Sequence, residues 1–143
     1  MPEEIFDNDV VSRSVLDPKD YVSGVLDLRK SFQFSNNNQY RQSVNCNRLL
    51  NDDVMAIHKL GLDKQALDHA NGRTERTYKG YCQSVVEPIR KINVNELAHF
   101  KVCHFLENNN NAHCHIEMYF TQKNARSEAV NQLVECFSDL IPY

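Results

Sequence analysis

The chain has 143 residues, of which 41% are hydrophobic and 24% are charged. These proportions are typical of globular domains and exclude a disordered or fibrous chain. The length suits one domain around a single core. The formal net charge is −3, and residues 1–20 alone contribute −4 (six acids against Arg13 and Lys19), which leaves the remainder close to neutral. A near-neutral body gives no electrostatic indication of nucleic-acid binding.

Two further classes are disfavoured. No hydrophobic run approaches the roughly 18 to 20 residues that span a bilayer, and the acidic start lacks the basic-then-apolar order of a secretory signal. We therefore expect a cytoplasmic protein that does not enter the membrane. The five cysteines are widely spaced and form no CxxC pair, which predicts reduced, mostly buried thiols rather than a disulfide framework or a zinc ribbon.

Residues 1–18 are polar and acidic and end at an Asp-Pro pair, a sequence that tends to stop regular structure. They are predicted to form a mobile arm or an edge element, followed by a single domain over residues 19–143. The segment 21–34 places its large hydrophobic residues at even positions, which favours one or two strands.

A pair of short helices is predicted within residues 52–71. Hydrophobic residues recur there at helical spacing, and Gly61 and Gly72 stand where each helix would stop. A strand follows within 74–88, interrupted by Gly80, and then a helical turn that opens at Pro88. Residues 98–106 and 112–120 are predicted to be two strands around an asparagine-rich loop.

The last predicted element is a helix that begins at Asn124. Its hydrophobic residues recur at a spacing of three and four positions, the pattern of a helix with one buried face, and they are Ala129, Val130, Leu133, Val134 and Phe137. These elements together predict an α+β fold: a mainly antiparallel sheet, a short helical pair, and a C-terminal helix packed on the sheet.

The histidine-rich hairpin is the main candidate site. If its loop has an even number of residues, positions whose numbers sum to 219 face each other, and alternate residues share a face. Four potential ligands then point the same way, namely His104, His113, His115 and Glu117. Imidazole and carboxylate groups in this arrangement suit zinc or manganese, with a water bound in an open position.

An odd loop would give a different result. One residue of slip sends His104 to the other face and sets Cys103 or Phe105 beside the remaining histidines. The alternatives to a metal site are histidines that only line a half-exposed sheet, or a metal-free acid–base histidine. No cofactor is then required.

A second candidate is a ligand-binding group formed by Arg29, Lys30, Arg41 and Ser43. Guanidinium, ammonium and hydroxyl groups together suit a phosphate or a carboxylate. The alternative is that the basic side chains only keep strand edges from pairing with another chain.

Two resemblances accompany these patterns. His113-Cys114-His115 is similar to the His-apolar-His motif of rolling-circle and relaxase-type endonucleases, although the following helix lacks their tyrosine. The order Ser31-Phe32, Ser43-Val44-Asn45 and Ala112-His113 resembles small uncharacterised bacterial proteins.

The second resemblance implies a bacterial accessory protein that works beside a larger partner protein in phage defence. We therefore expect an intracellular binding protein of this kind. The alternative is a metal-dependent hydrolase or nuclease that uses the histidine cluster.

Overall fold

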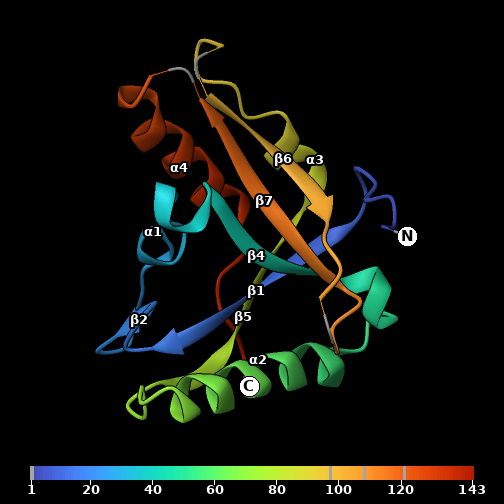
Figure 1. Cartoon of the computed structure of the whole chain (residues 1–143), viewed down its shortest axis with the longest axis vertical. Coiled ribbons are helices and arrows are strands. Elements are labelled where there is room, and N and C mark those ends of the chain that lie inside the picture. The colour runs from blue at the N-terminus through green and yellow to red at the C-terminus, as the bar shows by residue number, and fades with distance from the viewer. Residues whose placement is uncertain (1, 97, 108, 121) are drawn as a thin grey trace.

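The computed structural model describes residues 2–96, 98–107, 109–120 and 122–143. Within them, a six-stranded antiparallel sheet has the order β6-β7-β4-β1-β5-β8. Figure 1 labels the first five of these strands. The strands of the sheet are β1 (Val10–Asp17), β4 (Arg41–Cys46), β5 (Thr77–Val85), β6 (Ala98–His104), β7 (His113–Phe120) and β8 (Ile141–Pro142). A separate hairpin joins β2 (Tyr21–Val22) to β3 (Val25–Leu26).

Four α-helices accompany the sheet among the described residues. They are α1 (Leu28–Ser31), α2 (Val54–Ala70), α3 (Val86–Arg90) and α4 (Asn124–Cys136). Two 3-10 turns, Asn36–Asn38 and Asn47–Leu50, flank β4. The predicted α+β class with a mainly antiparallel sheet and a C-terminal helix is confirmed.

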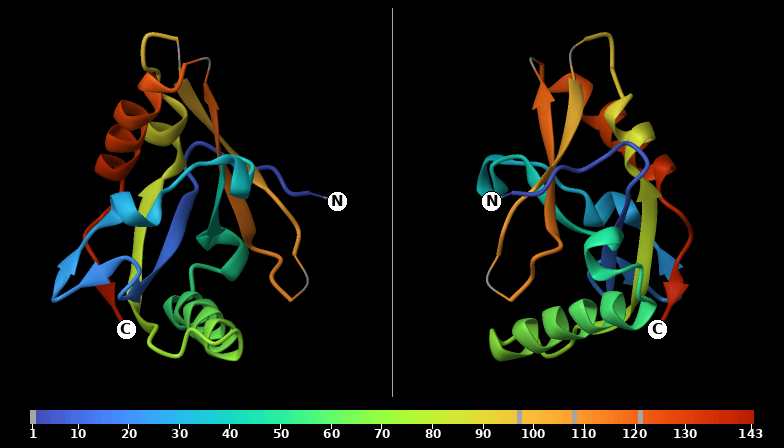
Figure 2. Two further views of the ribbon diagram at one scale, coloured as in Figure 1. Left: turned by 60° about the vertical axis from the view of Figure 1, so that its left-hand side comes forward. Right: turned by 90° about the vertical axis from the view of Figure 1, so that its right-hand side faces the viewer.

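The main core lies between one face of the sheet and helices α1, α3 and α4. Alternate residues of β6 and β7 are buried in it, as the period of two requires. Leu133 of α4 is fully buried, and Phe137 just beyond α4 packs against Phe32 with ring centroids 4.9 Å apart. Figure 2 shows α3 and α4 together on this side, with α2 lying across the end of the sheet.

The prediction of two short helices is wrong, because α2 is a single helix that continues through Gly61. Gly61 is not a stop signal: the ring of Tyr78 on β5 packs so closely that a Cβ at this position would overlap it. The buried side of α2 carries Ile57 and His58, and the His58 Nδ1 lies 2.8 Å from the Tyr78 hydroxyl. Helix α2 thus packs on the opposite face of the sheet from the main core.

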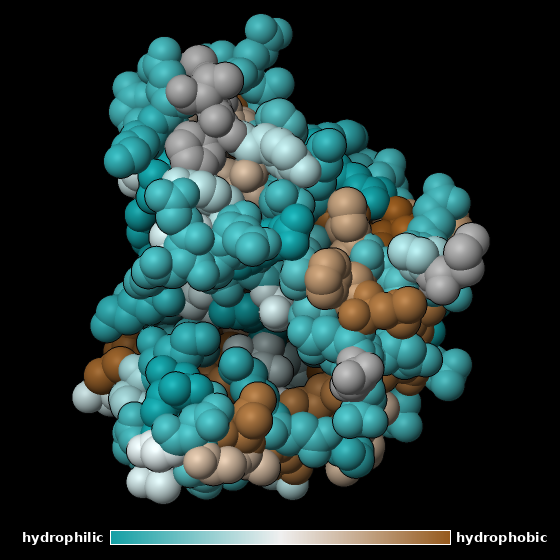
Figure 3. Space-filling view, viewed as in Figure 1, coloured by the Kyte–Doolittle hydropathy of each residue, from teal (hydrophilic) through white to brown (hydrophobic). Residues whose placement is uncertain are grey.

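Several hydrophobic residues of α2 are largely exposed. Val54, Met55 and Leu67 are 49%, 67% and 61% exposed, and Figure 3 shows hydrophobic residues along the lower edge of the molecule, where α2 runs in Figure 1. The helical periodicity of the sequence therefore identified a helix correctly but did not identify which side of it is buried.

The prediction of a mobile arm or an edge element is wrong for residues 10–17, which form an interior strand between β4 and β5. Val11, Val15 and Leu16 are fully buried there. The acidic composition of residues 1–20 concealed this strand because the acidic residues lie at or beyond its ends, whereas the apolar residues lie within it.

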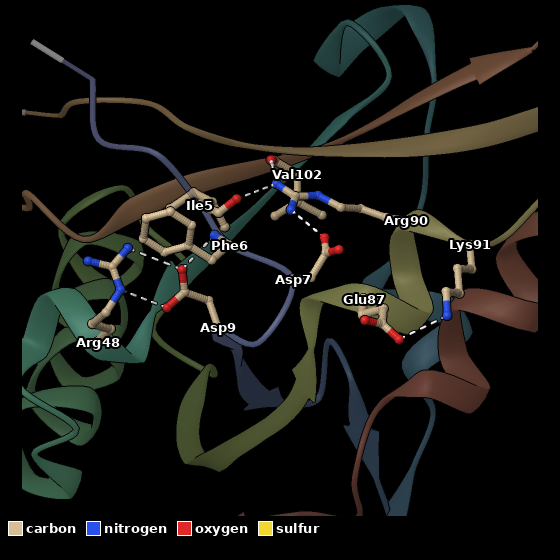
Figure 4. A network of polar contacts seen from close by, with 9 residues as sticks. All are labelled: Ile5, Phe6, Asp7, Asp9, Arg48, Glu87, Arg90, Lys91 and Val102. Atoms are coloured by element: carbon tan, nitrogen blue, oxygen red, sulfur yellow. Dashed lines mark hydrogen bonds and ion pairs between the residues drawn. The ribbon is translucent and has the colours of Figure 1, made fainter.

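The segment before β1 is also anchored, through acidic side chains (Figure 4). Asp9 accepts hydrogen bonds from the Arg48 guanidinium at 2.8 and 3.1 Å. Arg90 donates to Asp7 at 2.8 Å and to the Ile5 carbonyl at 2.6 Å. Charge-assisted hydrogen bonds of this kind are stronger than neutral ones, so this segment is held against α3 and the turn after β4.

The cysteines follow the prediction, since all five are free and Cys46, Cys82 and Cys114 are buried. Burial raises the pKa of Cys82 to about 11 and that of Cys114 to about 12. In the described part of the chain, no helix combines the length and apolar character that crossing a bilayer requires.

Candidate functional site

The β6–β7 hairpin forms as predicted, but its register does not. Cys103 faces His115 and His104 faces Cys114, so paired positions sum to 218 and the prediction of an even loop is wrong. The Phe105 N–H donates to the His113 carbonyl at 2.9 Å, which leaves seven residues, 106–112, in the loop. Position 108 of the asparagine run lies outside the described residues.

Asn109 and Asn110 shape the odd loop. Asn109 adopts a left-handed conformation with φ of 67°, which asparagine tolerates better than most residues. Asn110 accepts a hydrogen bond from the Ala112 N–H at 3.1 Å and donates to Asn45 on β4 at 2.9 Å. The neighbouring strand thus helps to set the loop, and the sequence of the hairpin alone does not contain this contact.

The register separates the four predicted metal ligands. His104 lies on the core face, buried, where its Nδ1 accepts from the Glu3 N–H at 2.8 Å and its Nε2 donates to the Asn111 carbonyl at 2.7 Å. His113, His115 and Glu117 share the other face. The described residues contain no group of three or more histidine, cysteine or acidic side chains arranged to hold a metal ion.

The second predicted group is also divided. Arg29 and Lys30 lie on α1 beside an open hollow next to α4, and Arg29 contacts Ser127 at 3.4 Å. Arg41 forms an ion pair with Glu117 at 3.5 Å. Only Ser43 of this group lies at the cavity described next.

A polar cavity of about 620 Å³ lies between α2 and the sheet face opposite the main core, a volume in the range of small-molecule sites. Strands β1 and β4 and the start of β7 form its floor, whereas α2 and the residues Glu107, Asn109 and Asn110 form its walls. The lining residues include Ser12, Arg13, Ser14, Lys19, Gln42, Ser43, Asn45, Lys64, Glu107 and His113.

The cavity opens where two central strands separate. β1 pairs with β4 through Val11 opposite Cys46 and Ser12 opposite Asn45, near the end of β4. Beyond these pairs, Arg13 donates to the Ser43 carbonyl at 2.7 Å. The guanidinium therefore provides the donor that a neighbouring strand would otherwise supply to this carbonyl.

Arg13 is only 6% exposed, yet its hydrogen bonds go to neutral groups. Besides the Ser43 carbonyl, it donates to the hydroxyl and carbonyl of Ser31 and to the Gln42 amide, each at 2.9 Å. Among the described residues, no carboxylate lies within 4 Å of it; the Phe32 ring centroid lies 5.4 Å from the guanidinium carbon, and Asp20 attracts the charge at longer range. A buried charge without a close counterion is costly.

Two lysines add to this positive charge. Burial, and next the charge of Arg13, lower the pKa of Lys19 to about 8. The same two causes lower the pKa of Lys64 on α2. Within the described chain neither lysine has an ion-pair partner, whereas the cavity residue Asp63 is already paired with Lys59 at 3.0 Å. The three cations repel one another, so a bound anion would relieve all of them.

Ser43 and His113 form a hydrogen-bonded pair at the other side of the cavity. The His113 Nδ1 lies 2.9 Å from the Phe105 carbonyl, which can only accept, so Nδ1 carries the proton of the neutral ring. The His113 Nε2, 3.0 Å from the Ser43 Oγ, is then the acceptor for the serine hydroxyl. Ser43 is exposed and His113 is 4% exposed, the arrangement of an accessible hydroxyl beside a buried base.

His115 and Glu107 complete this side. The His115 ring stacks on Phe105 with centroids 4.3 Å apart and lies edge-on to His113 at 4.9 Å. Burial, and next the neighbouring His113 and Arg41, lower the pKa of His115. A carboxylate oxygen of Glu107 lies 3.4 Å from the His113 Nε2.

Sequence reasoning missed Arg13, Lys19 and Lys64. Arg13 did carry a signal, because it is the single charged residue in the stretch Val10–Leu16. A cation within an otherwise apolar and small-residue strand indicates a buried functional or structural charge. Lys19 lies in the turn after β1 and Lys64 lies on α2, and neither carries a comparable signal.

No protein-family model matches the chain, and neither a curated protein nor a solved structure does.

Proposed function

We propose that this protein is a binding protein whose cavity between α2 and strands β1 and β4 takes a small anionic ligand, such as a phosphate ester or a carboxylate. The observation that carries the proposal is the buried guanidinium of Arg13, which is bonded only to neutral acceptors. Four of its five N–H groups are used in these bonds, so the guanidinium offers an anion its positive charge and one remaining N–H.

The electrostatics of the cavity support the same ligand class. Lys19 and Lys64 flank Arg13, and each has its pKa lowered by burial and by the charge of Arg13. Glu107 and Asp20 provide some negative charge, but Glu107 lies beside His113 and Asp20 forms no close ion pair with the three cations. An anion at this place therefore gains more from the cations than it loses to the acids.

Sulfate tests the proposal, because its charge is constant near neutral pH. We expect calorimetric titration at low ionic strength to show one sulfate site per chain. Lys64→Gln should weaken binding by about 1 to 2 kcal/mol, or roughly 5- to 30-fold, since one nearby unit charge is lost. Lys64 is preferred to Arg13 because it lies on the surface of α2, where its substitution leaves the core intact.

Lys91→Gln is the matched control. It removes the same charge from an exposed side chain that is paired with Glu87 on α3, on the other side of the molecule, and should leave the sulfate affinity unchanged. Equal effects of the two substitutions would contradict the proposal, as would a wild-type protein that binds no sulfate below about 10 mM.

The remaining expectations stay predictions. These are cooperation with a larger partner protein in phage defence, a cytoplasmic location, and zinc or manganese binding at the hairpin. The divided positions of His104 and His113 lend no support to the metal-dependent hydrolase or nuclease.

A further inference from the structure

We infer that Ser43 is a nucleophile and His113 is its general base, and that the protein hydrolyses a carboxylic ester that also carries an anionic group. The inference rests on the proposed function, because the cations of the cavity would hold that anionic group while the ester lies at Ser43.

The geometry of the pair satisfies what nucleophilic catalysis requires. The Ser43 Oγ is exposed to the cavity and lies 3.0 Å from the His113 Nε2, within the reach of proton transfer. The Phe105 carbonyl holds the opposite nitrogen at 2.9 Å, so the ring keeps both the orientation and the tautomer in which Nε2 is the base. A carboxylate often has this orienting role, but a backbone carbonyl provides the same acceptor.

Neighbouring groups can stabilise the charges that develop. Glu107 lies 3.4 Å from the His113 Nε2, where it stabilises the imidazolium that forms when the serine loses its proton. Asn45 lies two residues along β4 on the same face as Ser43. Its Oδ1 accepts from Asn110 at 2.9 Å, and within the described residues its own amide N–H groups have no acceptor. These N–H groups are the donors available to an oxyanion.

The chemical steps balance with water as the second reactant. The Ser43 Oγ forms a bond to the ester carbonyl carbon while its proton passes to the His113 Nε2. The bond between that carbon and the leaving oxygen then breaks, and His113 returns the proton to the departing alcohol. Water attacks the acyl-serine and gives a proton to His113, after which the Ser43 Oγ leaves, regains that proton, and frees the carboxylic acid.

The substrate class follows from the two ends of the cavity. Arg13, Lys19 and Lys64 select an anionic group on the part of the substrate that does not react. Leu60 and Leu67 of α2 also line the cavity and provide an apolar surface for the chain that joins this group to the ester. An anionic ester should therefore react faster than a neutral one of similar length.

The test compares two chromogenic esters. We expect mono-4-nitrophenyl glutarate, which carries a free carboxylate, to be hydrolysed faster than neutral 4-nitrophenyl butyrate. Ser43→Ala and His113→Gln should each lower the rate for the glutarate ester about 100-fold or more, as expected when a nucleophile or its base is removed. Ser127→Ala and His99→Ala, at exposed positions away from the cavity, are matched controls that should keep the wild-type rate.

Covalent labelling of the wild-type protein provides a second measurement that does not depend on the folding of any variant. A fluorophosphonate should modify Ser43, as shown by mass spectrometry of the peptide. Labelling elsewhere, or ester hydrolysis that Ser43→Ala retains, would overturn the inference. Sulfate binding without hydrolysis or labelling would overturn the inference and leave the proposed function standing. A protein that neither binds sulfate nor hydrolyses the esters would overturn the inference and the proposed function together.

Discussion

His104 and His113 carry their ring protons on different nitrogens, and in each case a backbone group decides which. The Glu3 N–H can only donate, so it requires a bare Nδ1 on His104, whereas the Phe105 carbonyl requires a protonated Nδ1 on His113. His104 consequently uses both nitrogens within the framework of the protein. His113 directs its unprotonated nitrogen to a hydroxyl at a cavity, which is why we assign the chemistry to His113 alone.

Gly61 provides a prediction at the same scale. Replacing an exposed glycine within a helix by alanine usually raises the free energy of unfolding by about 1 kcal/mol. Here the new methyl group would meet the ring of Tyr78, so we expect Gly61→Ala to lower the free energy of unfolding by about 1 to 3 kcal/mol, the usual cost of overpacking. Urea denaturation measures the change.

The control for Gly61 is Ala66→Gly, at an exposed position of the same helix. It should cost only the helical propensity, about 1 kcal/mol. A Gly61→Ala protein more stable than wild type would show that the Tyr78 ring moves aside freely.

At the scale of elements, the sequence predicted those whose signals are local. The C-terminal helix follows from its own periodicity, and α4 buries Ala129, Val130 and Leu133 as expected. The predicted break at Gly61 failed because the reason for that glycine is a ring on β5, in a different element. The predicted register of the hairpin was wrong for a similar reason, since Asn110 of its loop contacts Asn45 on β4.

The candidate site shows the same division. Ser43 and His113 were each identified, but in two separate hypotheses, because they are 70 positions apart in the chain. They meet only because β4 pairs with β7 in antiparallel register. Strand order in a sheet with non-local connections cannot be obtained from local pattern, so the pair could not be recognised before the fold was known.

Helix α4 allows a direct test of the core. Leu133 is fully buried between α4 and the sheet, so Leu133→Asp loses the burial of a large side chain and places a charge in an apolar environment. We expect a loss of about 5 kcal/mol or more, comparable with the whole stability of many domains. Circular dichroism should show an unfolded protein at 25 °C.

Asn131→Asp is the control on α4. It introduces a carboxylate of nearly the same shape at an exposed position two residues away, and it should leave the melting temperature nearly unchanged. A folded Leu133→Asp protein with wild-type melting would contradict the packing of α4 on the sheet.

At the scale of the whole molecule, acidic residues near the N-terminus join parts that are distant in sequence. Asp9 links the start of β1 to Arg48, and Asp7 links the same segment to Arg90 of α3. Burial acts to raise the pKa of Asp9, but hydrogen bonds from Arg48 and the Phe6 N–H outweigh it, and the pKa lies below its usual value. This carboxylate therefore stabilises the fold in its charged form.

The sign of the pH dependence follows. Because the pKa of Asp9 is lowered in the folded state, its carboxylate stabilises the fold at pH values above its ordinary pKa of 3.8. This contribution is lost as the pH falls through the folded-state pKa. We expect Asp9→Asn to cost about 1 to 2 kcal/mol at pH 7, because hydrogen bonds to a charged group are lost. The difference from wild type should shrink towards pH 3, as followed by urea denaturation.

Glu75→Gln, which removes an exposed carboxylate, should show no such trend. An Asp9→Asn penalty that is the same at pH 3 and pH 7 would mean that the charge of Asp9 is not the source of the stabilisation.

The dual use of Ser43 has a mechanical consequence. Its carbonyl is bound by Arg13, and its hydroxyl is bound by His113. One residue therefore connects the cationic end of the cavity to the end that holds His113. A ligand that displaces the Arg13 guanidinium would also displace the Ser43 carbonyl bound to it, and with it the backbone that orients the Ser43 hydroxyl. Ligand binding at the cationic end of the cavity is then expected to reorient Ser43 slightly at the other end.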